Sequence, residues 1–234
     1  MYSMQRTPEW HRERKGKVTA SVAGTIIGVN KYQKATELWK EMTGQKKPFT
    51  GNYFTQYGTR NEPNALNAYV HQTLNNVESV GFVQHKCHDW MGGSPDGLVD
   101  QDGLVEFKCP NPRSKSMYTD DTIPLHYFVQ CQLLMEVTDR QWCDLFVWTL
   151  EENRVWRFKR DVDFFDYICP MLAHFHGNVA NGTTPPAPSP NIVTNTEAAM
   201  RASMVPTPVY GPSPFSKRLK TSHGDGDDAQ VGCV

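Results

Sequence analysis

The fold of this chain is decided by Gly92-Gly93-Ser94-Pro95-Asp96-Gly97-Leu98-Val99-Asp100-Gln101-Asp102-Gly103-Leu104-Val105-Glu106-Phe107-Lys108-Cys109-Pro110. Asp102-Gly103 is a strong hairpin signal, so a strand that begins near Asp96 should turn back at residues 100–103 and place Glu106 beside Asp96. Successive side chains on a strand alternate between faces, so Glu106 and Lys108 point one way and the apolar residues between them point the other. Two carboxylates and a lysine are therefore expected to share one edge of a sheet.

This arrangement suits a divalent cation. Mg²⁺ prefers oxygen ligands and is usually held by one or two carboxylates together with water and substrate phosphate. Lysine acts as a compact positive charge beside a phosphate or a metal-bound water. An ordinary surface hairpin with a weak Glu-x-Lys ion pair is the alternative. The Pro-Asp turn and the hairpin geometry favour the metal site.

The 234 residues are enough for one well-buried domain with an appended segment. No apolar run is long enough to span a membrane, and the first residues lack the apolar core of a signal peptide, so an intracellular location is expected. The six cysteines form no Cys-x-x-Cys pair, which indicates reduced and mostly buried thiols. His85, Cys87 and His88 are a further candidate zinc site, although no fourth ligand is evident.

Charge is distributed unevenly along the chain. Residues 1–50 contain ten Lys or Arg and four Asp or Glu, a net charge of +6, whereas residues 51–182 contain ten and seventeen, a net charge of −7. This distribution suits a basic approach for a polyanion that leads to an acidic, metal-dependent centre. Two solvated faces of opposite sign would give the same counts.

The N-terminal region predicts two helices. Thr7 is the expected N-cap of the first, and the second begins at Thr19-Ala20-Ser21. The joint between the helices is crowded by Arg12, Arg14, Lys15 and Lys17. An arginine beside hydroxyls at a helix N-terminus is a candidate phosphate site, because the helix dipole, the backbone N–H groups and the guanidinium all favour an anion. A surface basic cluster, with Ser21 as a simple cap, is equally compatible with the sequence.

The remaining elements predict an α/β (α+β) fold. Thr59-Arg60-Asn61-Glu62 fits a capping box, so Glu62 is either a cap or a third acidic group over the hairpin. A strand at 78–85, the hairpin, a helix near 124–137 and strands near 141–149 and 154–160 follow. A last helix starts at Asp161, with a break or kink at Pro170. Without the ends, the order is α-β-β-β-α-β.

The composition changes after residue 182 to Pro, Ser, Thr, Ala and Asn without an apolar period. We therefore expect one domain at 1–182 and a disordered tail at 183–234. Within the tail, Lys217-Arg218-Leu219-Lys220 is a candidate nuclear-import signal, which makes the host nucleus an alternative to a cytoplasmic location.

These motifs together resemble a known family. Ser94-Pro95-Asp96-Gly97 and Glu106-Phe107-Lys108-Cys109-Pro110, on an α-β-β-β-α-β order, resemble the restriction-endonuclease-like PD-(D/E)XK nucleases. The chain is most similar to the YqaJ-like viral recombinases, the lambda exonuclease family. Its Trp10…Arg14…Thr19-Ala20-Ser21, Gly58…Glu62 and Tyr127-x-x-Gln130 motifs follow in the order that family uses, and the resemblance covers about residues 8–170.

The resemblance implies a DNA exonuclease that needs Mg²⁺, for which Mn²⁺ can substitute, and that degrades one strand of linear duplex from its 5′ end in recombination, replication or repair. Asp96, Glu106 and the Phe107 backbone carbonyl would hold two ions, with Glu62 in the metal or water shell. Lys108 would position the attacking water and help to deprotonate it. The same resemblance gives supporting roles to Gln130 and Tyr127 and assigns the 5′-phosphate to Arg14 and Ser21.

The resemblance also implies a ring-shaped trimer that encloses DNA and works with a single-strand annealing protein. Pro63, directly after Glu62, departs from the family pattern. A structure-specific or nicking endonuclease of the same fold and a non-catalytic DNA-binding or assembly module are the alternatives. No Gly-x-x-x-x-Gly-Lys-Ser/Thr motif is present, which argues against an ATP-driven helicase-nuclease.

Overall fold

The computed structural model describes residues 5–114 and 122–206. Its main sheet is mixed, with the strand order β2-β5-β6-β7-β8-β9. These strands are β2 (Val77–Glu78), β5 (Gly97–Val99), β6 (Gly103–Lys108), β7 (Trp142–Trp148), β8 (Asn153–Lys159) and β9 (Met204–Val205). A small second sheet has the order β1-β4-β3. Its strands are β1 (Val18–Thr19), β4 (Met91–Gly93) and β3 (Val83–Gln84).

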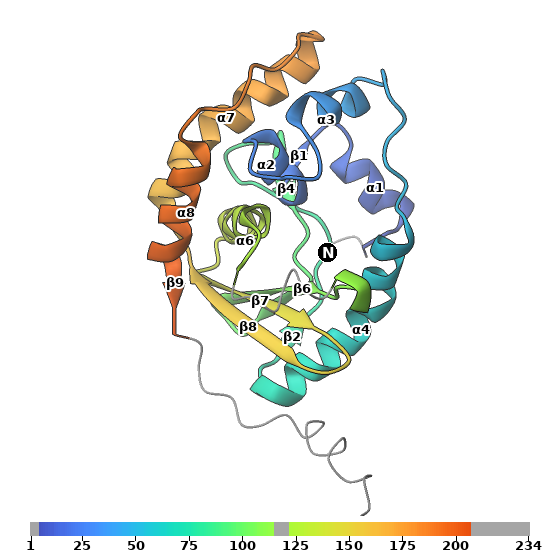
Figure 1. Ribbon diagram of the computed structural model, residues 1–234, viewed down its shortest axis with the longest axis vertical. Coiled ribbons are helices and arrows are strands. Elements are labelled where there is room, and N and C mark those ends of the chain that lie inside the picture. The colour runs from blue at the N-terminus through green and yellow to red at the C-terminus, as the bar shows by residue number, and fades with distance from the viewer. Residues whose placement is uncertain (1–4, 115–121, 207–234) are drawn as a thin grey trace, which may run out of the picture.

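Helices surround both sheets (Figure 1). The N-terminal ones are α1 (Pro8–Arg14), α2 (Ala20–Ile26), α3 (Ala35–Met42) and α4 (Tyr53–Thr73). The later ones are the short 3₁₀ helix η1 (Pro112–Ser114), then α6 (Leu125–Thr138), α7 (Val162–Asn181) and α8 (Ile192–Ser203). No helix in the described part of the chain is long and apolar enough to cross a membrane.

The predicted α-β-β-β-α-β order is confirmed by α4, the strands β2, β5 and β6, then α6 and β7. The first three strands form an antiparallel meander, and β6 pairs with β7 in parallel. Parallel neighbours require a crossover connection, and α6 provides it. The β6 strand therefore lies in the interior of the sheet, where its side chains meet helices on both faces.

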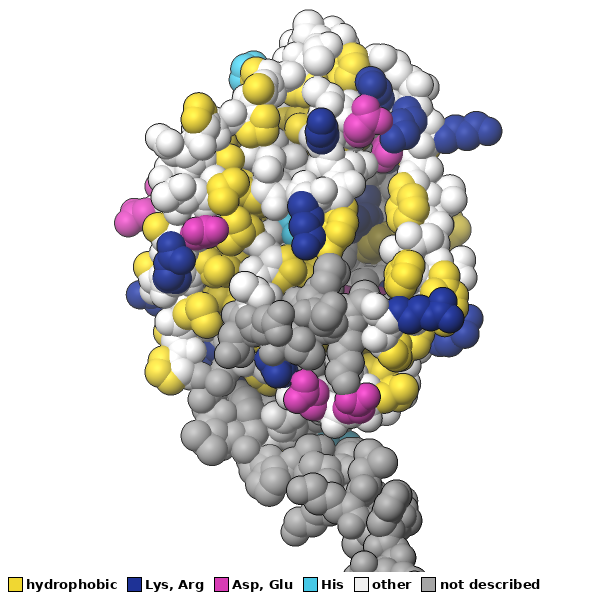
Figure 2. Space-filling view, viewed as in Figure 1, with side chains coloured by type: hydrophobic (Ala, Val, Ile, Leu, Met, Phe, Trp, Pro, Cys, Tyr) yellow, Lys and Arg dark blue, Asp and Glu magenta, His cyan; other side chains and the backbone are white. Residues whose placement is uncertain are grey.

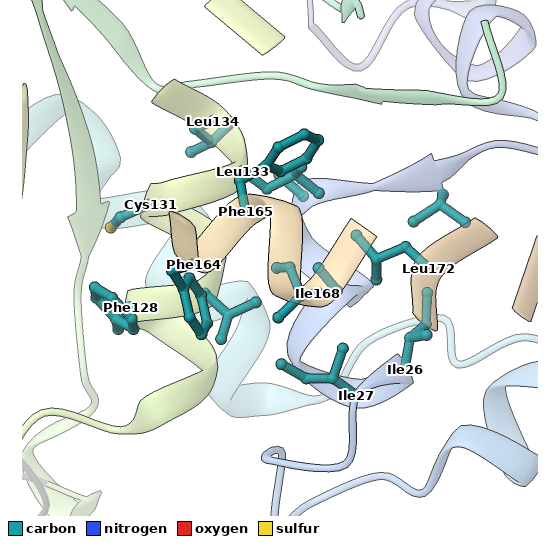
Figure 3. Packing of buried hydrophobic residues seen from close by; sticks show 14 of the residues in the cluster. Ile26, Ile27, Phe128, Cys131, Leu133, Leu134, Phe164, Phe165, Ile168 and Leu172 are labelled. Carbon is teal, nitrogen blue, oxygen red and sulfur yellow. The ribbon is translucent and has the colours of Figure 1, made fainter. Parts of the chain in front are cut away.

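The larger core surrounds α6. Figure 3 shows Phe128 and Leu133 of α6 packed among Phe164 and Ile168 of α7 and Ile27, which directly follows α2. The opposite face of the sheet carries a smaller core in which Tyr69 of α4 meets apolar side chains of β6 and β7. The strand period of two thus directs alternate β6 residues into different cores.

A buried polar network fastens α4 to the sheet. Asp144 is fully buried on β7, and both of its carboxylate oxygens accept hydrogen bonds from Arg157 of β8, at 2.7 and 2.8 Å. Tyr69 of α4 donates its hydroxyl to the same carboxylate at 2.8 Å. A buried carboxylate needs such partners, because leaving it unpaired costs several kcal/mol, on the order of 3–5. The network therefore constrains where α4 crosses the sheet.

The start of α4 differs from the prediction. The helix begins at Tyr53, where Asn52 and Thr55 form the capping box, so the predicted box at residues 59–62 is wrong. The sequence contains both patterns, and the earlier one caps the helix. Pro63 and Pro170 both lie inside continuous helices, so of the break or kink expected at Pro170 the break is absent. The strand expected at 78–85 is two short strands in different sheets.

The disorder predicted from residue 183 is wrong for residues 183–206. Pro188 packs against Gly28, Ile192 at the start of α8 is buried, and β9 pairs with β8. Proline-rich composition predicted disorder, but proline has little conformational entropy to lose and can line an apolar surface. Residues 207–234, with the candidate import signal at 217–220, lie outside the described residues.

The contact between α2 and α6 predicts a strong glycine requirement. A Cβ at Gly24 would lie 2.6 Å from the Cβ and 2.7 Å from the Cα of His126. We expect Gly24→Ala to lower the free energy of unfolding by about 1–3 kcal/mol, because two backbones must move apart. Urea unfolding measures this change.

Gly177→Ala is the matched control, because Gly177 is also helical and its added Cβ would meet nothing within 4 Å. It should be neutral or stabilising by up to about 1 kcal/mol, the helix propensity difference. Equal effects of the two substitutions would contradict the close approach of α2 to α6.

Candidate active site

The β5–β6 hairpin places Asp96 beside Glu106, as the sequence predicted. Gly97 pairs with Val105 in an antiparallel register. Asp96, which precedes Gly97, therefore lies opposite Glu106, which follows Val105. The Phe107 backbone N–H donates to the Asp96 Oδ2 at 2.7 Å. This hydrogen bond extends the hairpin by one residue and holds the Asp96 carboxylate against β6.

Glu106 and Lys108 meet Gln130 on the face covered by α6. The Glu106 Oε1 accepts hydrogen bonds from the Lys108 Nζ at 2.7 Å and the Gln130 Nε2 at 2.6 Å. The Lys108 Nζ also donates to the Gln130 Oε1 at 3.1 Å and lies 4.5 Å from the centre of the Tyr127 ring. The structure therefore brings together all four residues that the sequence predicted at this edge and helix face.

The electrostatics of this group are those of crowded, partly desolvated charges. Burial raises the pKa of Asp96 well above its ordinary value of 3.8, and the charge of Glu106 raises it further. Burial opposes the charge of Lys108, yet Glu106, Tyr127 and Asp96 raise the pKa of its ammonium above the usual 10.5. Lys108 therefore stays protonated, and the two carboxylates share one nearby cation.

One oxygen of this group lacks a partner. The Glu106 side chain is only 6% exposed, and its Oε2 is buried without any hydrogen bond in the described residues. A buried unpaired carboxylate oxygen is costly, so it calls for an additional donor or cation. The described residues contain no cluster of three His, Cys, Asp or Glu side chains that could hold a metal alone. The pair fits Mg²⁺, which takes one or two carboxylates and completes its shell with water and phosphate.

Glu62 lies in the interior of α4 and therefore caps no helix. Its charge contributes to the raised pKa of Asp96, which places its carboxylate on the side of the candidate centre. It forms an ion pair with Arg6. Of the two roles that the sequence left open for Glu62, the structure excludes the cap.

The candidate phosphate site forms around Ser94, which the sequence analysis did not single out. The Ser94 hydroxyl accepts from the Trp10 Nε1 at 2.9 Å and from the Arg14 NH1 at 3.4 Å. The Arg14 guanidinium stacks 4.2 Å from the Trp10 ring, and burial lowers its pKa to about 10. Arg12 instead pairs with Glu9 on the exposed side of α1. Arg14 is thus the inward-facing arginine of the two.

Ser21 is exposed in the first turn of α2, and its hydroxyl lies 3.1 Å from that of Thr19. Ser21 and Arg14, both in the described part of the chain, form no hydrogen bond with each other. The two residues belong to neighbouring helices joined by β1, which runs parallel to β4 just before Ser94. Any anion that contacted both would lie beside the Ser94 turn.

The zinc site considered at residues 85–88 is not formed. The His85 Nδ1 accepts the backbone N–H groups of Cys87 and His88, each at 3.0 Å. Its other ring nitrogen lies 3.3 Å from a carboxylate oxygen of Glu136. Both nitrogens are occupied, so His85 stabilises the turn before β4 and is not a metal ligand.

One face of the molecule is hollowed. Figure 2 shows a depression between α4 and the part of the molecule built by α2 and α6, with Lys and Arg side chains at its rim and floor. A concave surface bordered by cations suits a polyanionic ligand.

Comparisons with known proteins show the family of the chain. Residues 9–141 match the family described as the YqaJ-like viral recombinase domain. The chain is 26% identical over 168 residues to a protein of Acanthamoeba polyphaga mimivirus, an alignment that covers 65% of this chain and 30% of that protein. It is 24% identical over 185 residues to protein YqaJ of Bacillus subtilis (strain 168), with 76% and 58% covered. The chain therefore spans 30% of the length of the mimivirus protein and 58% of the length of protein YqaJ.

Solved structures extend the comparison. The alkaline exonuclease LHK-Exo from Laribacter hongkongensis is 28% identical, with a TM-score of 0.67, over 84% of this chain and 100% of that chain. Its complex with dAMP gives a TM-score of 0.68. A phage-related exonuclease from Haemophilus somnus 129PT, 17% identical over 70% of this chain and 94% of that chain, has a TM-score of 0.57 and shows a shared fold.

The raised pKa of Asp96 predicts a pH-dependent cost in stability. As the pH rises above about 4, Asp96 loses its proton in the unfolded chain while it keeps it in the folded chain. The free energy of unfolding therefore falls with rising pH until the pH passes the pKa of Asp96 in the folded chain. Asp96→Asn removes this cost and can keep the hydrogen bond from Phe107. In EDTA we expect it to raise the free energy of unfolding at pH 7.5 by about 1 kcal/mol.

Urea unfolding at pH 4.5 and pH 7.5 tests this expectation. The increase in the free energy of unfolding should be smaller at pH 4.5, because the wild type is destabilised less by the ionisation of Asp96 at that pH. A gain that is equal at both pH values, or a less stable variant, would show that the Asp96 carboxylate is not crowded.

Proposed function

Because this chain belongs to the YqaJ-like viral recombinase domain family, we propose that it is a metal-dependent deoxyribonuclease that degrades one strand of linear duplex DNA from its 5′ end. The observation that carries the proposal is the assembled set of Asp96, Glu106 and Lys108, with a buried Glu106 oxygen that lacks a partner. Similarity to an alkaline exonuclease over most of the chain supports the choice of substrate class.

Asp96 and Glu106, together with the Phe107 carbonyl, would hold the cation. We propose Mg²⁺, with Mn²⁺ as a substitute and two ions per site. A bound divalent cation supplies an acidified water and neutralises charge on the phosphate. The roles of the protein residues follow from their own contacts.

Lys108 acts as a hydrogen-bond donor to an anionic oxygen. Its raised pKa keeps it protonated near neutral pH, so it orients the attacking water and stabilises developing negative charge. Gln130 bridges Lys108 and Glu106 through its amide, and the Tyr127 ring packs against the ammonium. Both residues hold Lys108 in place.

The Arg14 guanidinium, with Ser21 and Ser94, would bind the 5′-phosphate of the strand being degraded. Arg14 has no carboxylate partner among the described residues, so its charge remains available to a phosphate. Stacking on Trp10 orients the planar guanidinium, which suits recognition of a phosphate by two parallel hydrogen bonds. An end-recognising group beside the cleaving group would make the enzyme an exonuclease.

The proposed partners follow from the family resemblance. They are the ends of double-stranded DNA, further copies of this chain in a ring-shaped trimer, and a single-strand annealing protein. The proposed process is viral DNA recombination, replication or repair.

Lys108→Ala should retain binding to linear duplex but lose Mg²⁺-dependent cleavage by about 10³-fold, the usual scale for a charge-stabilising group. Release of acid-soluble nucleotides measures cleavage, and fluorescence anisotropy with EDTA measures binding. Lys86→Ala is the matched control, since Lys86 is an exposed lysine paired with Asp139. Full activity of Lys108→Ala would refute the assignment, and cleavage of closed circular DNA by the wild type would favour an endonuclease.

Arg14→Gln should abolish a preference for 5′-phosphorylated over 5′-hydroxyl ends. We expect the wild type to prefer the phosphate by about tenfold or more, the value of one good charge-assisted contact. Arg12→Gln removes the same charge two residues away, on the exposed side of α1, and should keep the preference. Equal wild-type rates on both ends would exclude the phosphate role of Arg14 and Ser21 without affecting the cleavage centre.

A further inference from the structure

The N-terminal segment before α1 is fastened to the motif that carries Asp96. The Gln5 side-chain amide donates to the Val80 carbonyl at 3.0 Å and to the Pro95 carbonyl at 2.9 Å. Pro95 directly precedes Asp96, so these bonds join the start of the described chain to the turn that presents the catalytic carboxylate. Because Arg6 follows Gln5 directly, these bonds place it at the edge of the candidate active site.

Arg6 adopts an uncommon backbone conformation. Its φ is +67°, in the left-handed region that non-glycine residues rarely occupy. Such a conformation costs on the order of 1 kcal/mol or more and persists where the surrounding structure enforces it. With Gln5 bound on one side and Thr7 capping α1 on the other, the Arg6 side chain is directed at Glu62, with which it forms an ion pair.

Stability alone does not explain this ion pair. The Arg6 and Glu62 side chains are 51% and 30% exposed. Ion pairs this exposed contribute little to folding, about 0–1 kcal/mol, which does not exceed the cost of the strained backbone. The contact is therefore better understood through what Glu62 does.

Glu62 acts electrostatically on two residues of the hairpin. Its charge raises the pKa of Asp96 and that of the Cys109 thiol, which follows Lys108. The centre would otherwise contain three carboxylates and one ammonium. Arg6 offsets part of this excess negative charge. It also donates a hydrogen bond to an oxygen of Glu62 that would otherwise be free to bind the cation.

We propose that Arg6 is a positioning residue that holds the Glu62 carboxylate beside Asp96, offsets its charge and keeps it out of the cation's ligand shell. Glu62 is then free to accept a hydrogen bond from the attacking water. This inference rests on the proposed nuclease function, because it assumes a divalent cation at Asp96 and Glu106. It makes Arg6 a determinant of how tightly that cation binds.

The test measures Mn²⁺ binding to the full chain without DNA by isothermal titration calorimetry. Arg6→Gln should bind Mn²⁺ about threefold to tenfold more tightly, because it releases the full negative charge of the Glu62 carboxylate to act on the cation. Arg6→Lys should retain the wild-type affinity. Arg12→Gln is the matched control, since it removes the same charge from the same segment without touching Glu62.

A merely structural role for Arg6 predicts unchanged or weaker Mn²⁺ binding in Arg6→Gln, and that result would overturn the inference. In a Glu62→Gln background the Arg6 substitution should have no further effect on Mn²⁺ affinity, as a double-mutant cycle requires if Arg6 acts through Glu62. At saturating Mn²⁺, Arg6→Gln should also cleave linear duplex about tenfold more slowly, because Glu62 loses its orientation.

The two levels of the proposal fail separately. A wild type that binds Mn²⁺ but leaves linear and circular DNA intact would refute the nuclease function, while the affinities would still decide the role of Arg6. Equal affinities of Arg6→Gln and Arg12→Gln, with active wild type, would refute the inference alone. Absence of Mn²⁺ binding by the wild type would refute both.

Discussion

The hydrogen bond from the Phe107 backbone to Asp96 is the constraint on which the site depends. It sets the hairpin so that Asp96 and Glu106 project on the same face. Since side chains alternate along a strand, a register slip of one residue would turn Glu106 into the α4 core and bring Phe107 to the surface of the site. The two cores on either side of β6 therefore fix the register of the strand, because each core accommodates only one of the two alternating sets of β6 side chains.

The arrangement of carboxylates at this site is electrostatically unfavourable in the folded chain. Asp96, Glu106 and Glu62 lie close enough for their charges to raise the pKa of Asp96, and one Glu106 oxygen has no partner. Well-packed helices around the sheet hold these groups together against their repulsion. Strained or unsatisfied groups of this kind are concentrated at functional sites, where the surrounding structure supports them.

The parts of the fold and site that could be predicted are those written in short stretches of sequence. The hairpin turn, the alternation of Glu106 with Phe107 and the spacing of Tyr127 and Gln130 are all local. Ser94 was missed because its partners Trp10 and Arg14 lie 84 and 80 residues away. Gln5 and Arg6 were missed for the same reason. The start of α4 was misplaced because two capping patterns compete over a few residues, and only tertiary contacts decide between them.

The composition after residue 182 was misleading for a different reason. Disorder predictions ask whether a segment can bury enough apolar surface by itself, whereas α8 and β9 use surface that α6 and β8 provide. The two residues of β9 also pair with Arg157 and Phe158 on the outer edge of β8, a seven-residue strand, and so shorten the edge that is open to other chains. An exposed strand of that length is a template for self-association. Shortening the protein at its compositional boundary would thus remove little of the candidate active site and yet favour aggregation.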